Sequence, residues 1–218
     1  MATQAHEMRL EPAARTRAGV TAAADQRLPG FLLFLLAAQF MTVIMLAASM
    51  VPGYDYAAAA ISDLGRLPET ALLFNVSLIA VGALSVVGGY LFFRSHGRMW
   101  LLALYVLAGI GAAGAGVFPL GTSDLHSIFA LLAFLFFNLL AIGTGAVLSG
   151  PMRWISFVAG LVGMVFVVLM VIGDSGNTAA FGAIGHGGTE RMIVYPVMLW
   201  MLAFGGYLMA ARADDPFA

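Results

Sequence analysis

Long apolar runs alternate with short polar or glycine-containing breaks along most of the chain. Each run extends for about 20 residues, the length that an α-helix needs to cross a bilayer. Each is also apolar nearly all round, as a helix that contacts lipid or other spanning helices must be. The runs are Gly30–Met50, Ala71–Phe93, Met99–Pro119, Ile128–Leu148, Trp154–Ile172 and Met192–Ala211.

This pattern predicts an all-α polytopic membrane protein with six transmembrane helices arranged as three helical hairpins. Residues 1–29 are polar, of mixed charge and rich in alanine, and we expect a cytoplasmic tail there. Residues 30–211 form the predicted six-helix transmembrane domain, and residues 212–218 form a second cytoplasmic tail. The connections expected on the opposite side are residues 51–70, 120–127 and 173–191.

The arginines indicate the orientation of these helices. Most of them lie in the two tails and in the connections on the same side as the tails: Arg9, Arg15, Arg17, Arg27, Arg94, Arg98, Arg153 and Arg212. Only Arg66 and Arg191 lie on the other side. Because positive charge is retained on the cytoplasmic side, we expect both termini to be cytoplasmic and the protein to lie in the cell inner (cytoplasmic) membrane.

Composition supports a membrane protein and excludes several kinds of chemistry. Of the 218 residues, 61% are hydrophobic and 10% are charged, against about 25% charged in soluble domains. The net charge of −1 offers no basic patch for nucleic acid. The chain contains no cysteine, so disulfides, thiolate zinc sites and iron–sulfur clusters are excluded. It also contains no lysine, which excludes a Schiff base with a retinal or a similar aldehyde.

One short motif occurs twice, after the first and after the third apolar run. Ser-Asp-Leu is found in ISDLG at Ile61–Gly65 and in TSDLH at Thr122–His126. The likeness continues from Leu73–Leu84 to Phe136–Val147, where Asn75 and Gly82 match Asn138 and Gly145 after a two-residue shift. One interpretation is an internal repeat of helical hairpins about an axis along the membrane normal. The other is chance similarity within a small apolar alphabet.

Most of the polar side chains fall in the connections expected outside the cell, so we expect specific recognition there. The first hypothesis is a site for a lipid headgroup or small polar ligand, in which two guanidinium groups bind an anion. Its candidate residues are Ser62, Asp63, Arg66, Asn75, Asp124, His126, Glu190 and Arg191. The alternative is that these residues only cap helices, form local ion pairs and face water.

The second hypothesis is a metal-dependent intramembrane lipid hydrolase. His126 and His186 with one carboxylate, such as Asp124 or Asp174, provide the ligand types of a two-histidine, one-carboxylate zinc site. His186, however, lies in AIGHGGTE, a glycine-rich stretch that we expect to be a flexible loop. Without such a site no cofactor is expected.

Two further hypotheses place less weight on the outer residues. A transporter would use Asn75 and Asn138, but the sequence places no charged residue deep in a span, where ion-coupled transporters usually need one. An accessory subunit would pack against a larger membrane complex or form a homo-oligomer. In every case membrane lipids are the expected partners.

Several motifs together resemble a known family. They are ISDLG at Ile61–Gly65, LFN at Leu73–Asn75, GVFP at Gly116–Pro119, LHSIFALLAF at Leu125–Phe134 and ERMIVYPVMLW at Glu190–Trp200. They resemble six-helix bacterial and archaeal membrane proteins known only as a domain of unknown function, and more distantly the Frag1/DRAM/Sfk1 group. The resemblance implies six helices and points to Ser62, Asp63, Gly65, Asn75, Pro119, His126, Glu190, Arg191, Tyr195 and Pro196. It implies no activity.

Overall fold

The computed structural model describes residues 2–211, with side chains from residue 26 onward, and this part of the chain is helical. The long helices are α1 (Ala2–Met50), α2 (Ala71–His96), α3 (Met99–Val117), α4 (Leu125–Val147), α5 (Gly150–Asp174) and α6 (Gly185–Ala210). Two short 3₁₀ helices, η1 (Ser62–Gly65) and η2 (Thr178–Ile184), lie in the connections α1–α2 and α5–α6. Six helical segments are long and apolar enough to cross a membrane, which confirms the predicted fold class.

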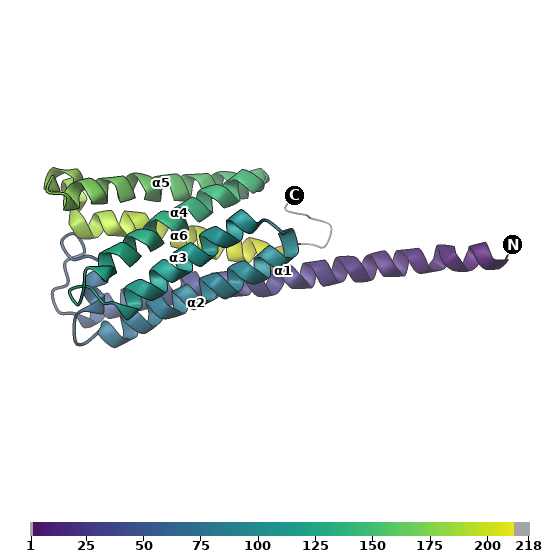
Figure 1. The fold of residues 1–218 in the computed structure, drawn as a ribbon, viewed down its shortest axis with the longest axis horizontal. Helices are drawn as coiled ribbons and strands as arrows, with labels where there is room; N and C mark the ends of the chain where they lie inside the picture. The colour runs from purple at the N-terminus through teal and green to yellow at the C-terminus, as the bar shows by residue number, and fades with distance from the viewer. Residues whose placement is uncertain (1, 212–218) are drawn as a thin grey trace.

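The six long helices form a closed ring in which each packs on its neighbours in the chain. Helix α1 also packs on α6, which closes the ring, and α4 reaches α6 across its interior. In Figure 1 the connections α1–α2, α3–α4 and α5–α6 lie together at one end, which we call the outer end. The connections α2–α3 and α4–α5 lie at the other end, where α1 continues beyond the bundle. Which end faces the cytoplasm stays a prediction from the arginines.

Glycines allow two pairs of helices to approach closely. A Cβ atom at Gly82 of α2 would lie 2.5 Å from the carbonyl oxygen of Gly109 on α3, and one at Gly109 would lie 2.7 Å from that of Gly82. Gly30 of α1 and Gly205 of α6 oppose each other in the same way, at 2.8 and 2.6 Å. Small residues are what brings helices together in lipid, because lipid tails provide no hydrophobic driving force.

Hydrogen bonds between helices add to this packing. Ser77 of α2 donates to Oε1 of Gln39 on α1 at 2.7 Å, and the hydroxyl of Ser85 donates to the carbonyl of Tyr105 on α3 at 2.9 Å. The indole N–H of Trp200 on α6 donates to the hydroxyl of Ser156 on α5 at 2.7 Å. These side chains lie within apolar runs, and no pattern in the sequence indicates their pairing.

The sides of the helices that point away from the interior of the ring are strongly apolar. Large side chains such as Leu72 and Trp154 are 79% and 66% exposed, as expected for helices that face lipid. The predicted spans correspond to these helices, but α4, α5 and α6 begin three, four and seven residues earlier than predicted. The largest correction concerns AIGHGGTE: its glycines belong to the start of α6 and not to a flexible loop. The predicted tail 212–218 lies outside the described residues.

Candidate functional site

The first Ser-Asp-Leu triplet forms a buried corner at the outer end of the bundle. Oδ2 of Asp63 accepts the Ala60 N–H at 2.9 Å and thereby closes the turn that leads into η1. Leu64 is fully buried, and the side-chain amide of Asn75 on α2 donates to the carbonyl of Gly65 at 2.9 Å. A Cβ at Gly65 would lie 2.6 Å from Oδ1 of Asn75, so a larger residue here would displace the asparagine side chain that bonds to this corner. Asp63, Gly65 and Asn75 therefore hold the loop against α2.

The second triplet has a different environment. Ser123 and Asp124 are exposed, and the hydroxyl of Ser123 accepts the Leu125 N–H at 3.0 Å at the start of α4. Asp124 makes no side-chain cap of α4. The two asparagines matched by the repeat also differ, because Asn75 lies one turn into α2 whereas Asn138 is completely buried in α4. The structure thus gives the matched residues separate local roles.

Arg191 fastens the α1–α2 loop to α6. Its Nη1 donates to the carbonyls of Tyr56, Ala59 and Gly187, each at 2.8 Å, and its Nη2 donates to the hydroxyl of Tyr54 at 2.9 Å. The guanidinium carbon also lies 4.9 Å from the ring centre of Tyr56 and 5.6 Å from that of Tyr54. The side chain is buried, and all of these partners belong to the protein. Its terminal nitrogens therefore point to the loop.

Tyr54 takes part in the same contact as donor and acceptor. Its hydroxyl donates to the carbonyl of Ala60 at 2.7 Å while accepting from Arg191. Burial raises the pKa of the Tyr54 phenol above its ordinary value, and the neighbouring guanidinium opposes this shift. The phenol consequently remains a neutral donor at physiological pH.

Glu190, one residue before Arg191, faces the interior of the bundle. It is 4% exposed, and its Oε2 accepts the backbone N–H groups of Ile61 and, at 3.5 Å, of Ser62. Oε1 of Glu190 receives no hydrogen bond from the residues that the structure describes. The corner formed by η1 is thus joined to α6 through Oε2 of Glu190, and Oε1 remains available as an acceptor.

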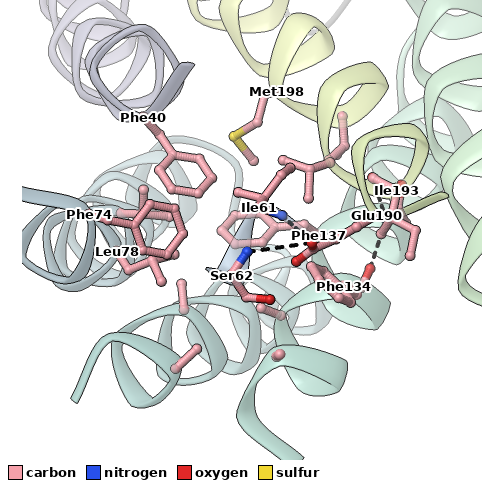
Figure 2. Close-up of a pocket in the computed structure, with 18 of the residues that line it drawn as sticks. Phe40, Ile61, Ser62, Phe74, Leu78, Phe134, Phe137, Glu190, Ile193 and Met198 are labelled. Carbon is pink, nitrogen blue, oxygen red and sulfur yellow. Dashed lines mark hydrogen bonds between the residues drawn. The ribbon is translucent and has the colours of Figure 1, made fainter. Parts of the chain in front are cut away.

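A largely apolar cavity lies below this corner, inside the ring of helices (Figure 2). Its volume is about 60 Å³. It is lined mainly by aliphatic and aromatic side chains of α1, α2, α3, α4 and α6, among them Phe40, Phe74, Phe134, Phe137 and Met198. Its polar lining consists of Ser62, His126, Asn138 and Glu190.

A wider groove of about 440 Å³ opens beside the cavity at the outer end of α4, α5 and α6. Leu131 of α4 and Met170 and Val171 of α5 contribute its apolar part. Ser127, Asp174, Ser175 and His186 contribute a polar part. Five residues line both the groove and the cavity, and we call them the junction: Ser62, His126, Ala130, Phe134 and Glu190. The two hollows therefore adjoin along these five side chains, of which Ser62, His126 and Glu190 are polar.

His126 is buried at this junction and has a defined ring orientation. Its Nδ1 lies 2.9 Å from the carbonyl oxygen of Phe118 and 3.2 Å from that of Ala115. Because a carbonyl oxygen only accepts, we assign the proton of the neutral ring to Nδ1. Nε2 then carries a lone pair, and it makes no hydrogen bond with the described part of the chain.

The residues considered for a metal do not come together as a ligand set. Nε2 of His186 lies 3.2 Å from Oδ1 of Asp174 at the rim of the groove, while Asp124 lines neither hollow. Among residues 26–211, no group of three histidine, aspartate or glutamate side chains is placed to hold a metal ion. A zinc site with His126, His186 and Asp124 is thus without structural support, although His126 and His186 line the same groove.

Asn138 connects three helices beneath the junction. Its Nδ2 donates to the carbonyl of Phe134 at 2.8 Å and to that of Ile193 on α6 at 3.3 Å. Pro196 lies inside α6 and has no N–H, so it weakens the helix hydrogen bonding of the preceding turn, where Ile193 lies. Oδ1 of Asn138 is buried without a partner among the described residues, against Gly163 of α5.

Of the residues that the sequence indicated, only Ser62, His126 and Glu190 meet at the junction, with His186 at the groove. The side chain of Arg66 is 57% exposed, and its Nη1 lies 3.7 Å from Oδ1 of Asp63. Arg66 lines neither hollow. Sequence reasoning missed Phe134, which lines both hollows, and it did not assign Asp174 to the ligand site. Phe134 lies in a uniformly apolar run, so nothing in the sequence could have distinguished it.

Comparison with known proteins identifies a family without an assigned activity. The model of the family described as "Protein of unknown function (DUF998)" matches residues 34–207, which is most of the six-helix bundle. No curated protein and no solved structure matches the chain. The chain belongs to the DUF998 family, and the more distant similarity to the Frag1/DRAM/Sfk1 group stays a prediction.

Proposed function

We propose that the protein binds an amphiphilic membrane molecule, a lipid or a lipid-like compound, at the outer end of its helix bundle. The observation that carries this proposal is the pair of hollows that adjoin along the junction. Binding sites for small molecules are usually concave and mostly apolar, with a few polar groups that fix orientation. An amphiphile would place its apolar end in the cavity and its polar end at Ser62, His126 and Glu190.

The size of the cavity limits what it can enclose. A water molecule needs about 10–15 Å³ of such volume, so a cavity of about 60 Å³ admits roughly four groups of that size. This is room for the end of an alkyl chain or for a compact apolar group, and not for two complete acyl chains. The remainder of a larger molecule would lie in the groove at the outer end of α4, α5 and α6.

The contacts of Arg66 and Arg191 favour a structural role for these two arginines over an anion-binding role. The Nη donors of Arg191 bond to the α1–α2 loop, and Arg66 lies next to Asp63. Asp63 and Asn75 likewise bond to backbone groups of the loop. We therefore assign ligand contact to the junction and support of the loop to these four residues. We propose binding and not hydrolysis, because the described residues provide no group of metal ligands.

Filling the cavity tests this proposal. Ala133 of α4 lines the cavity, and Ala133→Leu would occupy part of it, whereas Ala83 of α2 is exposed on the lipid-facing side. Both variants and the wild type would be purified in mild detergent and their retained lipid measured by native mass spectrometry. We expect the wild type and Ala83→Leu to retain an amphiphile and Ala133→Leu to lose it. Equal retention in all three proteins would contradict the proposal.

A further inference from the structure

We infer that the polar end taken by this site is a protonated amine. This inference rests on the proposed function, because it assigns the chemical class of the molecule that the junction binds. It follows from the charges, the aromatic rings and the free acceptor atoms around Glu190.

Apart from the histidines, the titratable side chains that line the two hollows are carboxylates. Glu190 lines both hollows, and Asp174 lies at the rim of the groove. No arginine lines either hollow, and the chain contains no lysine. A phosphate or carboxylate at the junction would therefore lie beside the carboxylate of Glu190, whereas the Nη atoms of the neighbouring Arg191 bond to the α1–α2 loop and to Gly187 and line neither hollow. A cation would meet a partner of opposite charge.

Aromatic rings line the same hollows as this carboxylate. Phe134 lines both hollows, and Phe137, Phe74 and Phe40 line the cavity. Figure 2 shows Phe134 and Phe137 close to Glu190 on the side of α4. The face of an aromatic ring attracts cations. An apolar chain alone would need the rings but not the buried carboxylate.

The unpaired polar atoms at the junction are of the type that a primary ammonium group requires. Oε1 of Glu190, the hydroxyl oxygen of Ser62 and Nε2 of His126 have no hydrogen-bond partner in the described part of the chain. All three can accept, and all three residues line both hollows. A primary ammonium has three N–H donors and no acceptor. A hydroxyl has one donor, and a quaternary ammonium has none.

Four probes with the same eight-carbon chain separate these possibilities: octylamine, octanol, octanoate and octyltrimethylammonium. Their binding would be measured by thermal shift and calorimetry on the full chain in phosphatidylcholine nanodiscs. We expect octylamine to bind most tightly and octanoate most weakly. Glu190→Gln keeps an acceptor for Ile61 and Ser62 but removes the charge, so we expect it to weaken octylamine by about tenfold and the uncharged octanol by less. Glu69→Gln, at an exposed glutamate outside both hollows, is the matched control.

The melting temperature of Glu190→Gln without ligand would show whether the variant is folded, and octanol binding provides a second check. The inference is overturned if octanoate or octyltrimethylammonium binds as tightly as octylamine, or if folded Glu190→Gln retains the amine affinity. If one of these overturning results is obtained while Ala133→Leu still abolishes octanol binding, the inference fails and the proposed function stands. If Ala133→Leu affects no probe, both fail.

A second set of nanodiscs, which contain phosphatidylethanolamine, would show where the amine comes from when octylamine binding is measured again. If phosphatidylethanolamine in the bilayer weakens octylamine binding, the amine of a membrane lipid competes for the site. If it has no effect while octylamine still binds, the site takes a free amphiphilic amine. Either result supports an ammonium site.

Discussion

Replacing Arg191 by methionine removes the contact between α6 and the α1–α2 loop while retaining a side chain of similar length. The variant loses the hydrogen bonds to Tyr54, Tyr56 and Ala59. It also loses the guanidinium contact with the two tyrosine rings. The bond to the Gly187 carbonyl lies within α6 itself, so its loss does not loosen the loop.

The expected cost follows from these contacts. A net contribution of about 1 kcal/mol for each of the three bonds to the loop gives about 3 kcal/mol. Removing a buried charge also relieves part of its desolvation penalty, which lowers this sum. We therefore expect Arg191→Met to reduce the free energy of unfolding by about 2–3 kcal/mol.

Arg66→Met is the matched control, because it removes the other outward arginine. Arg66 is 57% exposed and lies 3.7 Å from Asp63, and exposed pairs of this kind contribute about 0–1 kcal/mol. Unfolding in mixed detergent micelles, followed by circular dichroism, gives both values. Hydrogen exchange of the backbone amides at Ile61 and Ser62 should become faster in Arg191→Met alone. If the two variants lose the same small amount of stability, the structural role assigned to Arg191 is wrong.

Two further predictions concern packing and pH. Gly163→Ala should lower the free energy of unfolding by about 1–3 kcal/mol, because the new Cβ would overlap the side chain of Asn138. Gly206→Ala is the control in the same unfolding assay and should be near neutral, because a Cβ at Gly206 would have no neighbouring atom within 4 Å. Burial raises the Tyr54 pKa above its ordinary value of 10.0 in the folded protein, so its contribution to stability is fully present below about pH 10 and is lost at higher pH as the folded phenol ionises. Difference absorbance at 295 nm between the wild type and Tyr54→Phe should show this late ionisation, and a phenol that titrates at or below pH 10 would contradict it.

The membrane-spanning architecture could be predicted because it depends on local properties of the sequence. Runs of about 20 apolar residues are sufficient to identify spanning helices, since a bilayer imposes both their length and their polarity. The start of α6 could not be predicted, because glycine favours loops in water but is common in membrane helices. Gly187 lies in α6 where a Cβ would collide with the carbonyl of Ala59, a residue far away in the sequence.

The site could be predicted only in part, because its composition depends on which distant residues meet. His126 and Glu190 are conspicuous as polar residues beside apolar runs, and both lie at the junction. Arg191 is equally conspicuous, yet its bonding partners belong to a loop more than one hundred residues earlier, and no local pattern reveals them. Phe134 and Ala133 line the cavity because of the rotation of α4 in the ring, which the sequence alone does not define.

The central claim is that an amphiphile binds inside the ring of helices at the junction. The most direct test is photocrosslinking with an octylamine derivative that carries a diazirine on its chain, followed by peptide mapping of the labelled wild-type protein. We predict labelling of α4 between Ala130 and Phe137 and of α6 between Glu190 and Met198, with loss of both labels in Ala133→Leu. Labelling confined to lipid-facing residues such as Val158 and Val165 of α5, unchanged in Ala133→Leu, would contradict the account.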